Sequence, residues 1–115
     1  MRLDGSKILN PGLLRHTITW QQKTVSGQNS FGEDIYEWDD VMVCRARVTA
    51  LAGRELEAAQ QRWAEARFQI EQHYVSGLKR AMRVAWGDRL LDVIDAEDPW
   101  GTGMALRAMA KEWTA

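Results

Sequence analysis

Alternating apolar and polar side chains run through most of this sequence and predict a protein built mainly of strands. Over residues 15–23, His16, Ile18 and Trp20 fall on one face of an extended chain, with polar side chains on the other. Period-two alternation of this kind is typical of a half-buried strand. We expect His16 to be a hydrogen-bonded histidine at the edge of the core rather than a ligand.

A second, longer extended stretch covers residues 35–51. Its apolar face includes Cys44, which we expect to behave as a small buried hydrophobe. The alternation is disturbed at Asp39-Asp40-Val41, where we expect a bulge that resets the register. Residues 24–34, rich in Gly, Ser and Asn, are expected to form one long loop before this strand. Phe31 in that loop either folds back on the protein or faces a partner.

At Gly53 the period changes from strand to helix. Residues 53–63 consist mostly of helix formers, with Leu56, Ala59 and Trp63 on one face. Gly53 is suited to start this short helix. A helix of this length is marginal without packing, so its order depends on what it contacts.

Three further extended stretches follow the helix. Residues 64–74 alternate again, and residues 82–86 and 90–96 flank Gly87-Asp88, a pair typical of a two-residue hairpin turn. Residues 97–103 are expected to form a second loop. The final stretch, 104–113, fits either a helix face or a strand that closes the sheet.

These elements together predict a mainly β protein: a small antiparallel β-barrel of five or six strands in meander order, with one short helix between the second and third strands. An open sheet of this kind would leave apolar edges exposed, so closure is expected. Residues 1–14 are interpreted as an N-terminal arm and residues 15–115 as one barrel domain. The arm is either a frayed terminus or a segment that orders on a partner through Ile8, Leu9, Leu13 and Leu14.

Composition and charge narrow the class of protein. Lys and Arg number 15 against 16 Asp and Glu, and both halves of the chain are close to balance, which disfavours an autonomous nucleic-acid binder. A single cysteine excludes a disulfide framework. No apolar run approaches the length of a membrane span and the start lacks an apolar signal region, so we expect no membrane partner and a location in a reducing compartment such as the cytoplasm.

The residues typical of catalysis do not converge in the sequence. His16 and His73 lie on opposite kinds of strand face, and the acidic pairs are adjacent in sequence or in loops. No nucleophile elbow, phosphate-binding glycine loop or zinc-binding helix motif is present. We therefore expect no enzyme activity, no catalytic or metal-binding residues, and no cofactor.

Five blocks in the chain, spread over residues 14–98, resemble the head–tail joining proteins of tailed phages, also called head-closure or stopper proteins. The resemblance rests on their order and spacing as much as on each block. The blocks are Leu14–Thr19; Phe31-Gly32-Glu33 followed by Trp38 and Val41; Leu51-Ala52-Gly53-Arg54-Glu55; Ala58-Ala59-Gln60; and Met82-Arg83-Val84 with Gly87-Asp88-Arg89 and Asp92-Val93-Ile94.

The resemblance implies a structural virion protein that assembles as a ring, expected to be twelve-fold, beneath the portal and adaptor proteins. Such a ring retains packaged DNA, lets the duplex pass without sequence-specific binding, and offers a surface to the tail terminator or other tail proteins. The protein is then expected in the virion, at the junction of head and tail, and in the host cytoplasm during assembly. A small β-barrel nucleic-acid-binding module is the alternative.

The resemblance also places two sets of functional residues. The segment between the second and third strands, about Thr49–Arg62, would enter the channel or lie between subunits, or else only cap a helix packed on its own barrel. Its candidate residues are Leu51, Gly53, Arg54, Glu55, Glu57, Gln60 and Gln61. The two loops would contact other virion proteins through Gly27, Asn29, Phe31, Gly32 and Trp100.

Overall fold

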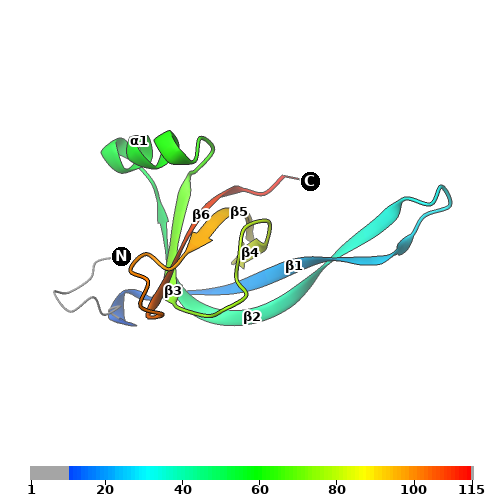
Figure 1. The fold of residues 1–115 in the computed structure, drawn as a ribbon, viewed down its shortest axis with the longest axis horizontal. Coiled ribbons are helices and arrows are strands. Elements are labelled where there is room, and N and C mark those ends of the chain that lie inside the picture. The colour runs from blue at the N-terminus through cyan, green and yellow to red at the C-terminus, as the bar shows by residue number, and fades with distance from the viewer. Residues whose placement is uncertain (1–10, 115) are drawn as a thin grey trace.

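The computed structural model of the chain describes residues 11–114 and contains six strands and one α-helix within that range (Figure 1). A single 3₁₀ turn, Pro11–Leu13, precedes the first strand. The elements in order are β1 (His16–Gln28), β2 (Asp34–Ala50), α1 (Gly53–Arg62), β3 (Phe68–His73), β4 (Arg83–Trp86), β5 (Arg89–Glu97) and β6 (Ala105–Glu112).

The six strands close into a barrel in the order β1-β2-β3-β6-β5-β4, and every neighbouring pair is antiparallel. The predicted mainly β class, antiparallel barrel and inserted helix are confirmed. The predicted meander order is wrong, because β3 pairs with β6 and β4 pairs with β1. The segment between β3 and β4 buries Leu78 and Met82 in the core as it crosses to β1, and this burial favours the crossover over a direct hairpin.

The core lies inside the barrel and includes a buried polar bond. Ile18, Trp20 and Ile70 are fully buried there. The Trp20 indole Nε1–H donates to Gln72 Oε1 at 2.7 Å, and the Cys44 thiol donates to the same oxygen at 3.4 Å. Gln72 thus points inward from β3 and satisfies the indole that the small core must accommodate.

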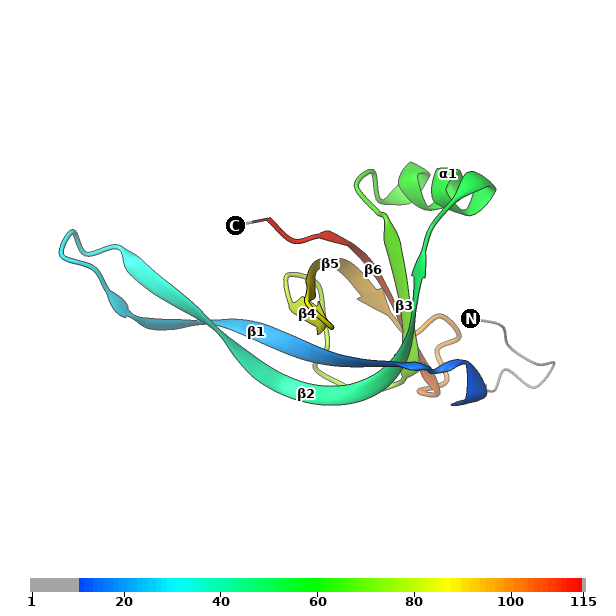
Figure 2. The same ribbon diagram turned by 180° about the vertical axis from the view of Figure 1, so that it is seen from behind.

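The long loop expected over residues 24–34 is wrong: most of it is strand. β1 continues to Gln28 and β2 begins at Asp34, so only Asn29–Glu33 turns the chain. Cross-strand pairs such as Thr24–Glu37 and Val25–Tyr36 extend the ladder, and a register shift between Val25 and Gly27 accommodates Ser26 as an extra residue. The result is a two-stranded ribbon that projects far beyond the barrel and gives the molecule its 57 × 27 × 27 Å extents (Figures 1 and 2).

Two local predictions about turns and bulges are confirmed. Trp20 pairs with Met42 and Gln21 with Asp40, so Val41 is the extra residue of a bulge at the expected position. Gly87 and Asp88 join β4 to β5, since Trp86 pairs with Arg89, and Gly87 has the positive φ of 62° that this turn requires.

The ambiguous last stretch is strand β6, and the reason for the ambiguity is that both of its faces are covered. Leu106, Ala108 and Ala110 point into the barrel core. On the outer face, Met109 is buried beneath α1 and Ala105 is buried against Leu14. A strand covered on both sides loses its alternation and mimics a helix pattern.

The predicted arm of residues 1–14 is described only at its end. Leu14 is buried at one end of the barrel, where Ala105 and Trp100 pack against it, and Leu13 is half-buried. Ile8 and Leu9 lie outside the described residues, so their part in an arm stays a prediction. None of the helices described has the length and apolar character that crossing a membrane requires.

Candidate assembly surfaces

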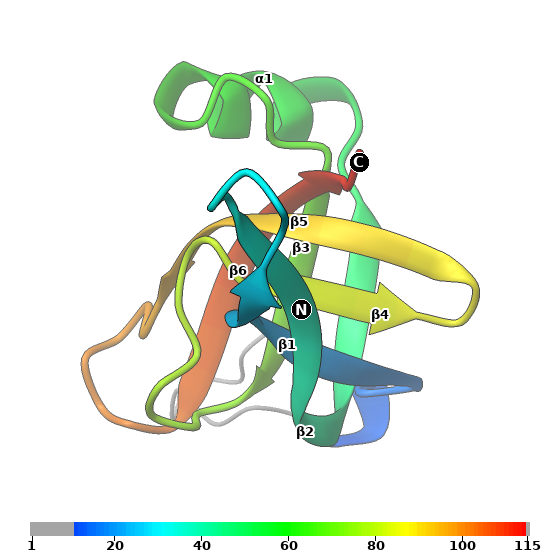
Figure 3. The same ribbon diagram turned by 90° about the vertical axis from the view of Figure 1, so that its right-hand side faces the viewer.

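Helix α1 carries most of the predicted channel residues, and most of its surface is free. Gly53 begins the helix with a φ of 56°, and Ala59 is its one buried residue. Arg54, Glu55, Glu57 and Gln61 are exposed, Gln60 is partly buried, and Leu51 is half-buried just before the helix. The helix stands on the outside of the barrel (Figure 3), so these side chains are available to a neighbouring molecule.

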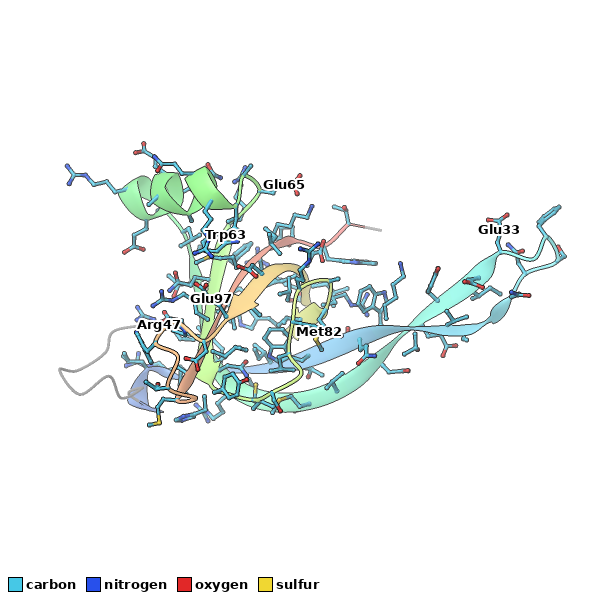
Figure 4. All side chains as sticks on the ribbon, viewed as in Figure 1. Glu33, Arg47, Trp63, Glu65, Met82 and Glu97 are labelled. Atoms are coloured by element: carbon cyan, nitrogen blue, oxygen red, sulfur yellow. The ribbon has the colours of Figure 1, made fainter. Side chains whose placement is uncertain are left out.

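The C-terminal end of α1 is where the helix is attached. Trp63, the residue after the helix, packs with Ala59, Ala66 and Met109, and its indole donates to Asp95 Oδ2 at 3.1 Å. Figure 4 shows Trp63 between the helix and the strands below it. Gln60 Nε2 adds a bond of 3.2 Å to the carbonyl of Ala66. The first turn of the helix has no comparable anchor among the described residues.

A recess lies between α1 and the outer face of the sheet. Its volume is about 570 Å³, and its lining includes Arg47, Leu51, Glu55, Trp63 and Arg107. The lining mixes both signs of charge with apolar surface and opens widely to solvent, which differs from the enclosed, largely apolar pockets that hold small molecules. The recess is therefore better suited to a protein segment than to a substrate.

The tip of the β1–β2 ribbon is a hydrogen-bonded turn built around Asn29. Asn29 Oδ1 accepts the backbone N–H of Phe31 at 2.9 Å and that of Glu33 at 3.0 Å. Two backbone bonds between Asn29 and residues 32 and 33 close the same turn, and Gly32 supplies a φ of 80°. The turn holds the Phe31 ring 84% exposed. Phe31 thus projects away from the protein, as expected of a contact residue.

The base of the ribbon is clamped to the barrel by an arginine between two tryptophans. The Arg83 guanidinium from β4 lies 4.5 Å from the ring centre of Trp38 and 4.8 Å from that of Trp113, and the two rings meet edge to face. Arg83 Nε also donates to Gln21 Oε1 at 2.7 Å. Burial lowers the pKa of Arg83, but a guanidinium stays charged. The clamp fixes the direction in which the ribbon leaves the barrel.

The remaining loop residues occupy different positions. Gly27 lies at the register shift near the tip, within strand β1 rather than in a loop. Trp100 is half-buried on the cluster of Leu14 and Ala105, and the side chain of Asp98 holds the loop through the backbone N–H groups of Trp100 and Gly103. Part of the Trp100 ring stays accessible, and its contact with a partner remains a prediction.

The histidines and the cysteine take structural positions. His16 Nδ1 accepts the backbone N–H of Val48 at 3.1 Å and its ring meets Trp86 edge to face, which confirms the predicted core-edge histidine. His73 is exposed at the end of β3. Burial raises the pKa of the Cys44 thiol. Within residues 11–114, no group of three or more His, Cys, Asp and Glu side chains is arranged to hold a metal ion.

The described residues thus form a closed barrel with two outward projections, each held at its base and exposed along much of its length. The family of phage head completion proteins matches residues 9–112, nearly the whole chain. The chain therefore belongs to the phage head completion protein family. It is a structural protein of the phage head and is located in the virion.

Two solved structures share the fold. A protein of Shigella flexneri 2a, determined in solution, matches with a TM-score of 0.68 and 22% identity over 90% of this chain and 96% of that one. A chain from the virion of a native gene transfer agent particle matches with a TM-score of 0.61 and 16% identity over 89% and 97%. No curated protein matches the chain.

Proposed function

We propose that this head completion protein forms a ring of twelve copies that closes the phage head beneath the portal and adaptor, retains the packaged DNA, and gives the tail its attachment surface. The observation that carries the proposal is the pair of projections, α1 and the ribbon, which leave the barrel in different directions (Figure 1). Both leave most of their side chains exposed, as expected of elements completed by neighbouring molecules.

In this proposal the segment 51–62 faces the channel or the neighbouring subunit. Arg54 and Arg62 balance Glu55 and Glu57 on the helix, so its surface has no net charge. A neutral wall suits a channel that must release DNA, because each basic contact to phosphate would add salt-dependent affinity. Gly53 would act as the hinge of the segment, and Arg54 and Glu55 would pair between neighbours.

The ribbon tip and the 97–103 loop would contact partners, with Phe31 and Trp100 as their rings. The protein would be free in the host cytoplasm until the filled head recruits it. The balanced charge of the molecule supports recruitment by shape and specific contacts rather than by general attraction to DNA.

The test is complementation of heads that lack the protein. Wild-type protein should restore nuclease-protected DNA and tail attachment. The Arg54→Ala/Glu55→Ala variant should lose DNA retention at least several-fold, whereas Lys79→Ala/Asp88→Ala, which also removes one exposed charge of each sign, should complement fully. If the helix variant forms rings and retains DNA like wild type, the interface role of α1 is wrong. If wild-type protein binds duplex DNA tightly but ignores the portal–adaptor complex, the connector function is wrong.

A further inference from the structure

Strands β1 and β2 form the ribbon tip at one end of the molecule and line a surface recess at the other end. Beyond Gln21, β1 pairs with β2 alone. Residues 22–39, the projecting part of the ribbon, are called the arm from here on, and the name no longer refers to residues 1–14. At the other end of the same two strands lies a surface recess of about 480 Å³, here called the basal groove. It is lined by Leu13, Arg15, His16, Arg47 and Val48–Ala50. Figure 4 shows Glu33 at the arm's tip and Arg47 at the far end of the molecule.

The two ends carry opposite charge. The arm has four carboxylates, Glu33, Asp34, Glu37 and Asp39, against one basic side chain, Lys23. The basal groove has the two guanidinium groups of Arg15 and Arg47, and no carboxylate is among the described residues that line it. Arg15 Nε donates to the carbonyl of Gly12 at 3.4 Å, and Arg47 lies opposite the buried Glu71 in the pairing of β2 with β3. The arm and the lining of the basal groove therefore carry complementary charge.

The arm also lacks cover for its apolar side chains. Val25, Ile35 and Tyr36 are 56%, 45% and 50% exposed, and Phe31 is exposed at the tip. A two-stranded ribbon without a third strand or a covering layer is marginally stable in water. A partner surface that covers the arm would therefore stabilise it, and the four carboxylates exclude the phosphate backbone of DNA as that partner.

The arm cannot reach its own groove. Twelve residue steps separate His16 from Gln28 along β1, which is about 40 Å at about 3.3 Å per residue. The two surfaces therefore meet only between different copies. Because they differ, the contact is heterologous, and repetition gives either a closed ring or an open filament.

We propose that the acidic arm of one copy docks, Phe31 foremost, in the basal groove of the next copy, and that this head-to-tail contact joins the subunits. Glu33 and Asp34 would face Arg15 and Arg47 while the phenyl ring enters the groove between them. That repeated contacts close into a ring rests on the proposed function above. The contact between two copies does not depend on that function. The partner of the ribbon tip is thus a second copy of this chain.

A charge-swap experiment with purified protein tests the contact by sedimentation at low and high salt. The tip variant Glu33→Lys/Asp34→Lys and the groove variant Arg15→Glu/Arg47→Glu should each self-associate about tenfold more weakly or worse, because like charges then face each other. A one-to-one mixture of the two variants should regain association, and so should the fourfold variant. Lys79→Glu/Asp88→Lys, which reverses two charges away from both surfaces, should behave like wild type. Failure of both the mixture and the fourfold variant to recover overturns the proposal.

Crosslinking in assembled heads gives a second measurement that does not depend on free self-association. In a Cys44→Ser background, Ser30→Cys at the tip and Thr49→Cys in the groove should form disulfides between copies under a mild oxidant such as copper phenanthroline, giving a ladder of multimers on a non-reducing gel. A band that joins this chain to a different virion protein through Ser30→Cys, or no ladder in heads that retain DNA, overturns the contact while the ring stands. If the ladder forms and the charge-swapped variants recover association, but the protein fails to retain DNA in heads, the contact is upheld and the proposed ring function is overturned.

Discussion

Replacing Asn29 by alanine removes the side chain that organises the ribbon tip. Asn29 Oδ1 accepts the backbone N–H groups of Phe31 and Glu33 at 2.9 and 3.0 Å, and alanine provides neither bond. These amides are exposed, so water replaces the lost acceptor and no desolvation penalty remains. The expected effect is therefore a looser tip rather than an unfolded protein.

The magnitude follows from the two bonds. Both amides are exposed, so each bond contributes a net of about 0.5–1 kcal/mol, and the loss of both costs the closed turn about 1–2 kcal/mol. The population of the closed turn relative to open forms then falls by about 5- to 30-fold. Because residues of the arm beyond Gln21 pair only with each other, opening the tip exposes no barrel core, and the melting temperature should change by less than about 2 °C.

Amide hydrogen exchange resolved at Phe31 and Glu33 measures this directly. Exchange at both amides should accelerate about 5- to 30-fold in Asn29→Ala. Asn29→Asp keeps an acceptor oxygen and should retain protection, and Ser30→Ala, which truncates the exposed neighbouring side chain, should match wild type. Unchanged exchange in Asn29→Ala, or a melting temperature lower by many degrees, would refute the view of the tip as a locally ordered turn.

Two further predictions concern the clamp and the core. Arg83→Met removes the guanidinium that lies between Trp38 and Trp113, and it should lower the free energy of unfolding by about 1–2 kcal/mol. Arg83→Lys should be intermediate, because an ammonium group cannot stack on a ring as a plane does. Urea unfolding measures both variants, and an Arg83→Met protein as stable as wild type contradicts the clamp. Burial raises the pKa of Cys44, so the thiol stays protonated to higher pH in the native protein. Its alkylation at pH 8 should therefore be slower in the native than in the urea-unfolded protein, and should accelerate as the pH rises further. Equal alkylation rates at pH 8 would contradict this prediction.

Much of the barrel follows from local pattern. The bulge at Val41 could be placed because the acidic pair before it falls out of phase with the apolar face. The β4–β5 turn could be placed because Gly87-Asp88 has the chemistry of a two-residue hairpin. Such features depend on residues close in sequence, so the sequence carries them explicitly.

The strand order and the arm could not be obtained in the same way. Whether β4 pairs with β3 or β1 depends on burying Leu78 and Met82, and that burial is a property of the closed barrel. The arm was hidden by Ser, Gly and Asn residues, which have low strand propensity. Thr24–Val25 on one side and Ile35–Tyr36 on the other are the strand-forming signal that points to it.

The same distinction between local and long-range information applies to the candidate assembly surfaces. Asn29, Phe31 and Gly32 could be selected from sequence because Phe31 is the one large apolar residue in a stretch of loop-forming residues; its exposure is a finding of the structure. The Arg83 clamp and the basal groove could not, since Trp38, Arg83 and Trp113 come from three strands or their ends, and Arg15 meets Arg47 through the pairing of β1 with β2. Residues distant in sequence become a surface only when the barrel closes.

The small size of the barrel core explains why α1 and the ribbon are each held to the barrel at few points. A domain of this size buries a limited core, and every ordered residue outside that core costs conformational entropy. The protein orders α1 through Trp63 and the ribbon through Arg83, two anchors at the barrel wall, and leaves the far parts of both elements exposed. Full burial against its own barrel would stabilise these elements further but would hide the surfaces that neighbours need. The division between a self-sufficient barrel and two elements completed by assembly is therefore what the fold of a head completion protein requires of its sequence.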